Sequence, residues 1–283
     1  MRDVIKLCIY ELKIQMLSKR VLLGYLVGIS IMLKFAVGYI QDGDYIGEPI
    51  NVLEPFIMVG NCDRIIMLLT VGWLLIMSGA PFVNKISFYA LYRTKRKLWN
   101  EAMVIYIFVQ ALLYYAVIAV VLMLLGGMNG YLANIWSVPF IDVLSSGSDS
   151  YLYGVDFPSS DYADVQSVYM GFFHTFALQV LYAVIIGIFV YVISQMTNRM
   201  AGPIAAFILH FLGYEIMKEG YGIVITYSLL ARSIPAFQLG KNALVNLGQS
   251  YLIFIVIIIL LVELSGKLVN YMDFKNMAIQ EGD

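Results

Sequence analysis

The residues of this chain that could carry chemistry are few and stand far apart. It has two cysteines, Cys8 and Cys62, and two histidines, His174 and His210. Their spacing matches no zinc-ligand pattern, and two distant cysteines make no disulfide framework. No G-x-S-x-G or H-E-x-x-H motif occurs, and the fragment nearest to a phosphate-binding loop, 239–242, lacks the upstream glycine and the Ser/Thr. We therefore expect no enzyme activity and no bound cofactor or metal.

Basic and aromatic side chains are concentrated between residues 78 and 101. Gly79 and Pro81 are expected to end or bend the helix before this segment. The mixture beyond them suits a short helix docked on another protein, and it suits an anionic lipid surface equally well. The side chains placed to make such a contact are Phe88, Tyr89, Tyr92, Arg93, Arg96 and Trp99.

A few ionisable residues interrupt otherwise apolar stretches, where such groups are costly and usually face the protein interior. We expect Lys34, His210 and Glu215 to be the candidates for lining a pathway, although Lys34 can also extend to the membrane surface. In the same stretch as Lys34, Gly24 and Gly28 form a G-x-x-x-G motif that permits close approach of a second helix.

The composition defines the environment of these residues. The chain has 283 residues, of which 61% are hydrophobic and 13% charged, about half the charged share of an average soluble domain. Disordered chains are poor in aromatics and rich in charge, so disorder is excluded. The formal net charge of −1 gives no reason to expect nucleic acid as a partner. We expect an all-α integral membrane protein whose residues 21–283 form a single transmembrane domain.

Six stretches approach the roughly 20 apolar residues that a transmembrane helix needs. They are 21–40, 65–83, 102–127, 168–194, 201–217 and 250–272. Most of the 18 Lys and Arg fall in the segments 1–20, 84–100 and the C-terminal tail. The loop 128–167 has neither Lys nor Arg but carries five aspartates. Because basic residues mark the cytoplasmic side, both termini are expected to be cytoplasmic and this loop extracytoplasmic.

Two kinds of short element should accompany the spans. Residues 1–20 predict an amphipathic helix on the inner membrane surface, with Ile5, Ile9, Leu12 and Met16 on its apolar face; a simple cytoplasmic extension is the alternative. The segment 218–249 predicts half-helices dipping into the outer leaflet, and 53–62 a second such cap, with ordinary lid structure as the alternative.

The segment around Pro81 carries a pattern of small residue, Ala-Pro-Phe, then Tyr-x-Leu-x-Arg-Thr-x-Arg-x-x-Trp. It is formed by Ala80, Pro81, Phe82, Tyr89, Leu91, Arg93, Thr94, Arg96 and Trp99. In this the chain resembles the membrane subunits of bacterial type-two ATP-binding-cassette (ABC) exporters. The resemblance implies that 86–99 form a coupling helix in a cleft of a cytoplasmic ABC ATPase subunit, with 195–200 making a smaller contact.

The same resemblance implies a permease in the bacterial cell membrane, paired with a second permease subunit that is identical or related. ATP would be bound by the partner ATPase and not by this chain. The substrate would be hydrophobic or amphipathic: a peptide, a lipid or a drug-like molecule. The long outer loop 128–167 departs from the family, in which the third and fourth spans are usually joined briefly.

Two other functions remain open. An ion-gradient secondary transporter would need a series of intramembrane carboxylates, for which Glu215 and Glu263 are the candidates, and no inverted repeat is visible. A non-transporting immunity or sensor subunit could instead use the acidic outer loop to capture a cationic ligand.

Overall fold

A computed structural model of the chain describes residues 2–83, 94–128, 130–146, 157, 159–219, 222–239, 243 and 245–271. Within these ranges the protein is all-helical and contains no β-strand. The α-helices are α1 (Arg2–Met16), α2 (Lys19–Ile46), α3 (Glu54–Gly60), α4 (Asp63–Met77), α6 (Arg96–Gly126), α7 (Val138–Ser146), α8 (Tyr162–Val165), α9 (Val168–Met196), α10 (Ala201–Glu219) and α11 (Leu247–Leu268). Three 3₁₀ helices are η2 (Gly222–Tyr227), η3 (Ala231–Ser233) and η4 (Pro235–Phe237).

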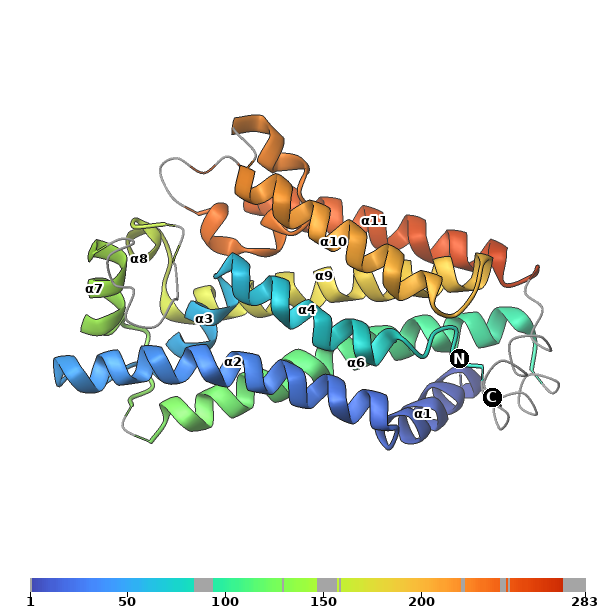
Figure 1. The fold of residues 1–283 in the computed structure, drawn as a ribbon, viewed down its shortest axis with the longest axis horizontal. Helices are drawn as coiled ribbons and strands as arrows, with labels where there is room; N and C mark the ends of the chain where they lie inside the picture. Colours follow the sequence, from blue (N-terminus) through green and yellow to red (C-terminus); the bar gives the residue numbers. More distant parts are fainter. Residues whose placement is uncertain are drawn as a thin grey trace.

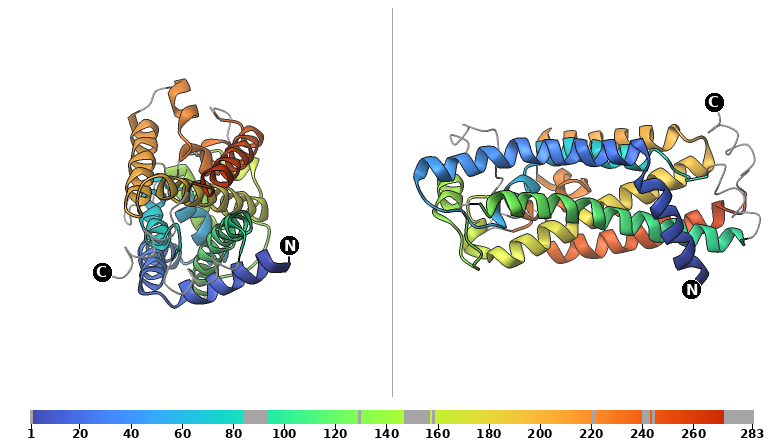
Figure 2. Two further views of the ribbon diagram at one scale, coloured as in Figure 1. Left: turned by 90° about the vertical axis from the view of Figure 1, so that its right-hand side faces the viewer. Right: turned by 90° about the horizontal axis from the view of Figure 1, so that it is seen from below.

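The long helices run side by side along the longest axis of the molecule, around α9 (Figure 1). α9 contacts α3, α4, α6, α10 and α11, and 72% of its most apolar 18-residue window is buried. A helix that is apolar on all sides must be covered on all sides, which explains its central position. Figure 2 shows α10 and α11 at the edge of the bundle, each packed against α9.

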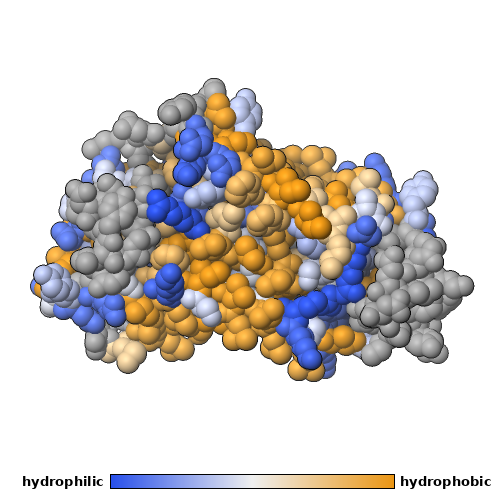
Figure 3. All heavy atoms as spheres, in the orientation of Figure 1, coloured by the Kyte–Doolittle hydropathy of each residue, from blue (hydrophilic) through white to orange (hydrophobic). Residues whose placement is uncertain are grey.

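Among the described residues, four helices are long and apolar enough to cross a membrane: α2, α6, α9 and α11. The number rises to five if α3 and α4, which meet at an angle of 89°, form one broken span. Only 11% of the α11 window is buried, and the exposed remainder is apolar. On the face shown in Figure 3, apolar side chains form a band with polar residues toward both ends. These features are compatible with a protein that crosses the membrane several times.

Two of the six expected spans are not among these four helices: one ends earlier than predicted, and the other is too polar. The stretch predicted to run to Val83 ends as a helix at Met77, because a turn begins at Ser78 and Pro81 cannot continue it. α10 has 19 residues and includes Pro203, His210 and Glu215, and it is not among the helices that meet the length and hydropathy requirement.

The first helix packs on the bundle through one side and leaves the opposite side exposed. Val4, Cys8, Glu11 and Gln15 are buried, mainly against α6, whereas Ile5 and Ile9 are about half exposed. Of the apolar face that the sequence predicts for a membrane surface, Ile5 and Ile9 are thus largely exposed, whereas Leu12 packs on the core and Met16 contacts Gln110 of α6. The start of α1 and the end of α11 lie at the same end of the bundle, and α7 and α8 lie at the opposite end (Figure 1).

The G-x-x-x-G motif of α2 lies where α2 meets α4. A Cβ atom on Gly24 would lie 2.5 Å from Cγ1 of Ile76 and 2.6 Å from the carbonyl oxygen of Gly72. A Cβ atom on Gly28 would collide with the hydroxyl group of Tyr114 from α6. The predicted close approach is confirmed: the motif brings two backbones together and leaves room for one tyrosine hydroxyl between them.

Candidate functional site

Residues 78–83 and 94–101 of the basic and aromatic segment are described, whereas 84–93 are not. Phe88, Tyr89, Tyr92 and Arg93 lie outside the described residues. Arg96 and Trp99 belong to the first turn of α6, and they act within the chain in different ways.

Arg96 connects the start of α6 to the end of α11. Its Nη1 donates hydrogen bonds to the carbonyl oxygens of Asn270, at 2.5 Å, and Val269, at 3.5 Å. A guanidinium group is favourable at a helix C-terminus, where the last carbonyl groups carry partial negative charge. The residue as a whole is exposed.

Trp99 was expected to contact a partner but is 1% exposed. Its Nε1 has no hydrogen-bond partner within the described structure. It lies next to Asn100, which donates to the Ser265 hydroxyl at 3.1 Å and accepts from Gln195 at 3.3 Å. Asn100 therefore links α6 to α9 and α11, and the neighbouring Trp99 is buried and offers no surface to another protein in this arrangement.

The turn at 78–82, which leads into the segment, is also held in the bundle. The Nε of Arg199 donates to the carbonyl oxygen of Ser78 at 3.3 Å. The guanidinium group of Arg20 lies so close to Gly79 that a Cβ atom there would be 3.0 Å from two of its nitrogens. The turn thus contacts basic residues at the start of α2 and just before α10, and a side chain at 79 would displace the flexible end of Arg20 by a few tenths of an ångström.

Phe82 completes this attachment. Its backbone has a φ of 63°, an uncommon conformation for a residue with a side chain. Its ring is 1% exposed and lies 4.9 Å from the ring of Tyr106 and 6.3 Å from that of Tyr191, measured between centroids. These two rings belong to α6 and α9, so the chain that leaves α4 is fixed to the centre of the bundle by an aromatic contact.

The three expected pathway residues are not brought together. Lys34 is exposed on α2, with its Nζ 5.5 Å from the centroid of the Phe35 ring. His210 is 1% exposed in the core, and Glu215 is half-buried further along α10. The contacts of His210 come from α4 and α9.

His210 joins two helices through its two ring nitrogens. Nε2 lies 3.2 Å from the carbonyl oxygen of Met67, and Nδ1 lies 2.7 Å from the hydroxyl of Tyr182. Because a carbonyl can only accept, Nε2 must donate, and a neutral ring then accepts the Tyr182 proton at Nδ1. The imidazole is satisfied without a charge, which suits a structural role better than a proton relay.

A further set of polar contacts, which the sequence analysis did not single out, continues along the same half of α9. Asn61, just after α3, donates to Thr175 at 3.0 Å and accepts from the backbone N–H of Ala236 at 2.9 Å. Gln179 donates to the carbonyl oxygen of Gly60. Their sequence signal was an amide or hydroxyl residue inside an apolar stretch, spaced so that Thr175, Gln179 and Tyr182 share one side of a helix.

Neutral donors and acceptors make up this buried set, which we call the polar column of α9. Its members are Asn61, Thr175, Gln179, Tyr182 and His210. Within the described residues, no group of three or more His, Cys, Asp or Glu is placed to hold a metal ion. The buried carboxylates in the same ranges are Glu11 and Glu54, and both have hydrogen-bond partners in the chain. The side chains of the column are buried, and their hydrogen bonds join α3, α9 and η4.

No protein-family model, no curated protein and no solved structure is similar to this chain. The class of protein is therefore defined by the fold alone. The chain is an all-helical protein with several helices apolar enough to cross a membrane.

The Tyr182–His210 contact gives a direct test of the core. Tyr182→Phe leaves Nδ1 of His210 buried without a donor, and we expect a loss of about 0.5–1.5 kcal/mol, since interhelical hydrogen bonds within membranes are modest. The measurement is thermal unfolding of the purified protein in detergent.

Tyr227→Phe is the matched control, because Tyr227 is exposed. Equal unfolding temperatures for the two variants would show that the Tyr182 hydroxyl contributes nothing at this site.

Proposed function

We propose that this chain is the permease subunit of a type-two ABC exporter in the bacterial cell membrane. In this proposal the bundle crosses the membrane six times, with the bent pair α3–α4 and the short helix α10 completing the four long spans. Both termini face the cytoplasm, and the segment 86–99 binds a separate ATPase through side chains other than that of the buried Trp99. A second permease subunit, identical or related, completes the transporter, which moves a hydrophobic or amphipathic substrate.

One observation carries the proposal: both ends of the basic and aromatic segment are attached to different helices of the bundle. At its start, Phe82 lies between Tyr106 and Tyr191. At its end, Arg96 is bonded to the end of α11, and Trp99 is buried. A partner that displaced the segment would therefore move α4, α6 and α11 together, which is what coupling to an ATPase requires.

The carboxylates favour an ATPase over an ion gradient as the source of energy. Glu263 is exposed on α11 and Glu215 is half-buried on α10, so they do not form a buried series. Glu54 and Glu11, which are buried, are engaged by hydrogen bonds, and their helices α3 and α1 lie toward opposite ends of the bundle (Figure 1). An ion pathway through the centre would need carboxylates between them.

Charge reversal at Arg93 tests the proposal. We expect Arg93→Glu to weaken co-purification with the cognate ATPase at least about tenfold, as loss of a central interface arginine commonly does, and to abolish stimulation of ATP hydrolysis. Arg93 is preferred over Arg96, because changing Arg96 would also disturb α11.

Lys13→Glu serves as the control, since Lys13 is an exposed cation of α1 outside the segment. Unchanged binding and unchanged stimulation in Arg93→Glu would count against the proposal. Movement of cargo by the purified chain without any nucleotide-hydrolysing partner would refute it.

A further inference from the structure

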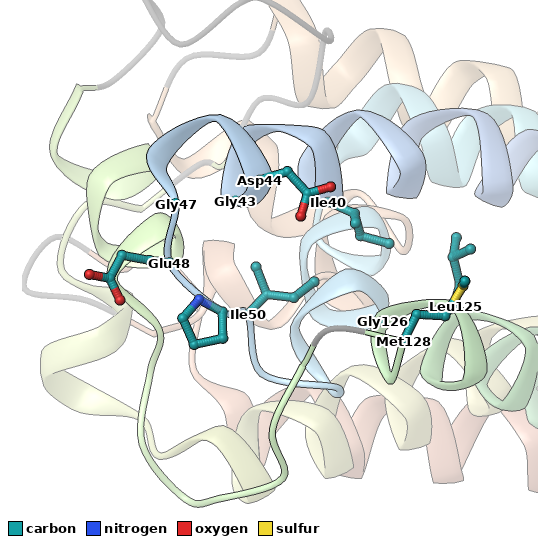
Figure 4. Close-up of a pocket in the computed structure, with 10 residues that line it drawn as sticks. Ile40, Gly43, Asp44, Gly47, Glu48, Ile50, Leu125, Gly126 and Met128 are labelled. Atoms are coloured by element: carbon teal, nitrogen blue, oxygen red, sulfur yellow. The ribbon is translucent and has the colours of Figure 1, made fainter.

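A cavity of about 470 Å³ lies at the C-terminal end of α2, which is the end of the bundle away from α1 in Figure 1; Figure 4 shows the residues that line it. It is formed by the last turns of α2 and α6 and by the chain that follows each of them. This volume falls within the roughly 300–1,000 Å³ that small-molecule sites occupy. It is separate from the coupling segment and from the polar column of α9.

The inner part of the cavity is apolar. Ile40 and Ile50 extend from one side toward Leu125 and Met128 on the other (Figure 4). Such a space accommodates a hydrocarbon group or an aromatic ring without leaving a polar group unpaired.

The cavity is held open by backbone contacts. The N–H of Tyr131 donates to the carbonyl oxygen of Ile50 at 3.0 Å, and the N–H of Val52 donates to the carbonyl oxygen of Tyr131 at 2.9 Å. Gly47 ends α2 in a left-handed conformation, with φ 80°. A site that is already formed loses little free energy to ordering when it binds a ligand.

The charge around the cavity is negative. Two carboxylates, Asp44 and Glu48, are among its lining residues, and none of those residues is Lys, Arg or His. Asp44 lies beside Ile40, whereas the side chain of Glu48 is directed away from Leu125 (Figure 4).

The C-terminal ends of two helices add to the negative electrostatic potential at the cavity. α2 and α6 both end at the cavity, and neither has a basic residue in its last turn. The free carbonyl groups of a helix C-terminus carry partial negative charge, so the two ends and Asp44 favour a cation together.

We propose that this cavity binds an organic cation with an apolar body, such as an amphipathic amine. The ammonium group lies near Asp44, and the apolar body lies between Ile40, Ile50 and Leu125. A phospholipid headgroup is disfavoured, because its phosphate would be repelled by the two carboxylates. This recognition goes beyond the proposed transport function and needs no ATPase.

The test uses the full chain in phosphatidylcholine nanodiscs, with empty nanodiscs as the blank. The probes are phenethylammonium and the peptide acetyl-Leu-Lys-Leu-amide, with 2-phenylethanol and acetyl-Leu-Gln-Leu-amide as uncharged analogues. We expect at least one cation to bind while its analogue does not, and the one that binds shows whether the amine is free or part of a peptide.

Variants assign the binding to the cavity. Asp44→Asn should weaken binding about fivefold, the effect of one partly exposed charge, and Asp44→Asn combined with Glu48→Gln should weaken it further. Met128→Lys should abolish binding by placing a cation at the cavity, and it should fold because Met128 is exposed. Asp164→Asn, an exposed acidic residue outside the cavity, should bind as the wild type does.

The proposal is overturned if neither cation binds, if the uncharged analogues bind equally well, or if the Asp44 and Met128 variants bind as the wild type does. Because no ATPase is present, each of these results leaves the proposed transport function untouched.

Discussion

Replacing Glu54 with alanine should destabilise the protein by at least about 3 kcal/mol, because it leaves several buried donors without an acceptor. The Glu54 side chain is 0% exposed at the start of α3. Its carboxylate accepts hydrogen bonds from the Tyr39 hydroxyl at 2.9 Å, the Asn51 N–H at 2.9 Å, and the N–H and hydroxyl of Ser137 at 2.7 and 2.6 Å.

These donors come from different parts of the chain. Tyr39 lies in α2, Asn51 lies in the chain leading to α3, and Ser137 directly precedes α7. The carboxylate thus ties α3 to α2 and to the region 130–146. The two backbone donors cannot turn away to find another partner, so their loss is not recovered by rotation.

Thermal unfolding in detergent measures the effect, and a fall of about 6–12 °C corresponds to the expected loss for a chain of this size. Glu54→Gln keeps the shape of the side chain and removes its charge. Because the amide nitrogen would face other donors while the amide oxygen still accepts, we expect a loss of stability smaller than that of Glu54→Ala. Glu48→Gln, at an exposed carboxylate nearby, should change little.

Should Glu54→Ala fail to accumulate, Ser137→Ala removes the hydroxyl that donates to Glu54 and accepts from the Phe140 N–H, and it should cost about 1 kcal/mol. An unfolding temperature for Glu54→Ala within 1–2 °C of the wild type would mean that the carboxylate does not hold these elements together.

Substitution of Gly72 should have an effect of similar size by a different mechanism, the separation of two closely packed helices. A Cβ atom at Gly72 would lie 2.5 Å from the Tyr114 hydroxyl, 2.8 Å from the carbonyl oxygen of Gly24 and 3.1 Å from the backbone nitrogen of Gly28. Two of these three neighbours are backbone atoms of α2, which cannot move without moving the helix.

We expect Gly72→Ala to cost about 1–3 kcal/mol, the usual range for overpacking, and Gly72→Val to prevent accumulation of folded protein. The Tyr114 hydroxyl also donates to the carbonyl oxygen of Leu69 at 3.0 Å, so it cannot simply swing aside. Thermal unfolding and the yield of monodisperse protein are the measurements.

A double variant distinguishes steric conflict from other effects of alanine. Tyr114→Phe removes one of the three close neighbours, so the pair Gly72→Ala and Tyr114→Phe should recover part of the loss but not all of it. Gly213→Ala is the matched control in α10, because the nearest atom to its Cβ would be 3.6 Å away. Equal stability of Gly72→Ala and Gly213→Ala would contradict the close packing of α2 and α4.

The sequence by itself determined the helical, membrane-compatible character of the protein and the approximate position of each long helix. Composition and the length of an apolar stretch can be taken directly from the sequence. Within a bilayer, few structures provide hydrogen bonds for all backbone N–H and C=O groups, and a helix is one of them. The glycine motif of α2 also predicted a close helix contact, because the absence of a side chain lets another helix approach closely, whichever helix it is.

Only the tertiary structure decided which neighbours meet. Gly72 as the partner of Gly28 was not predictable from α2 alone. Nor was the burial of Glu54, since its acceptor role depends on Ser137 from another part of the chain. The sequence predicted that Trp99 contacts a partner, because aromatic residues beside basic ones suit a docking helix. In the structure Trp99 is buried inside the bundle.

The physical reason is the same in each case. Helix formation depends on residues a few positions apart, whereas burial depends on which distant segments fold against a given side of the helix. Lys34, His210 and Glu215 all interrupt apolar stretches. Of the three, only His210 is buried in the core, where its ring forms hydrogen bonds with Tyr182 and Met67.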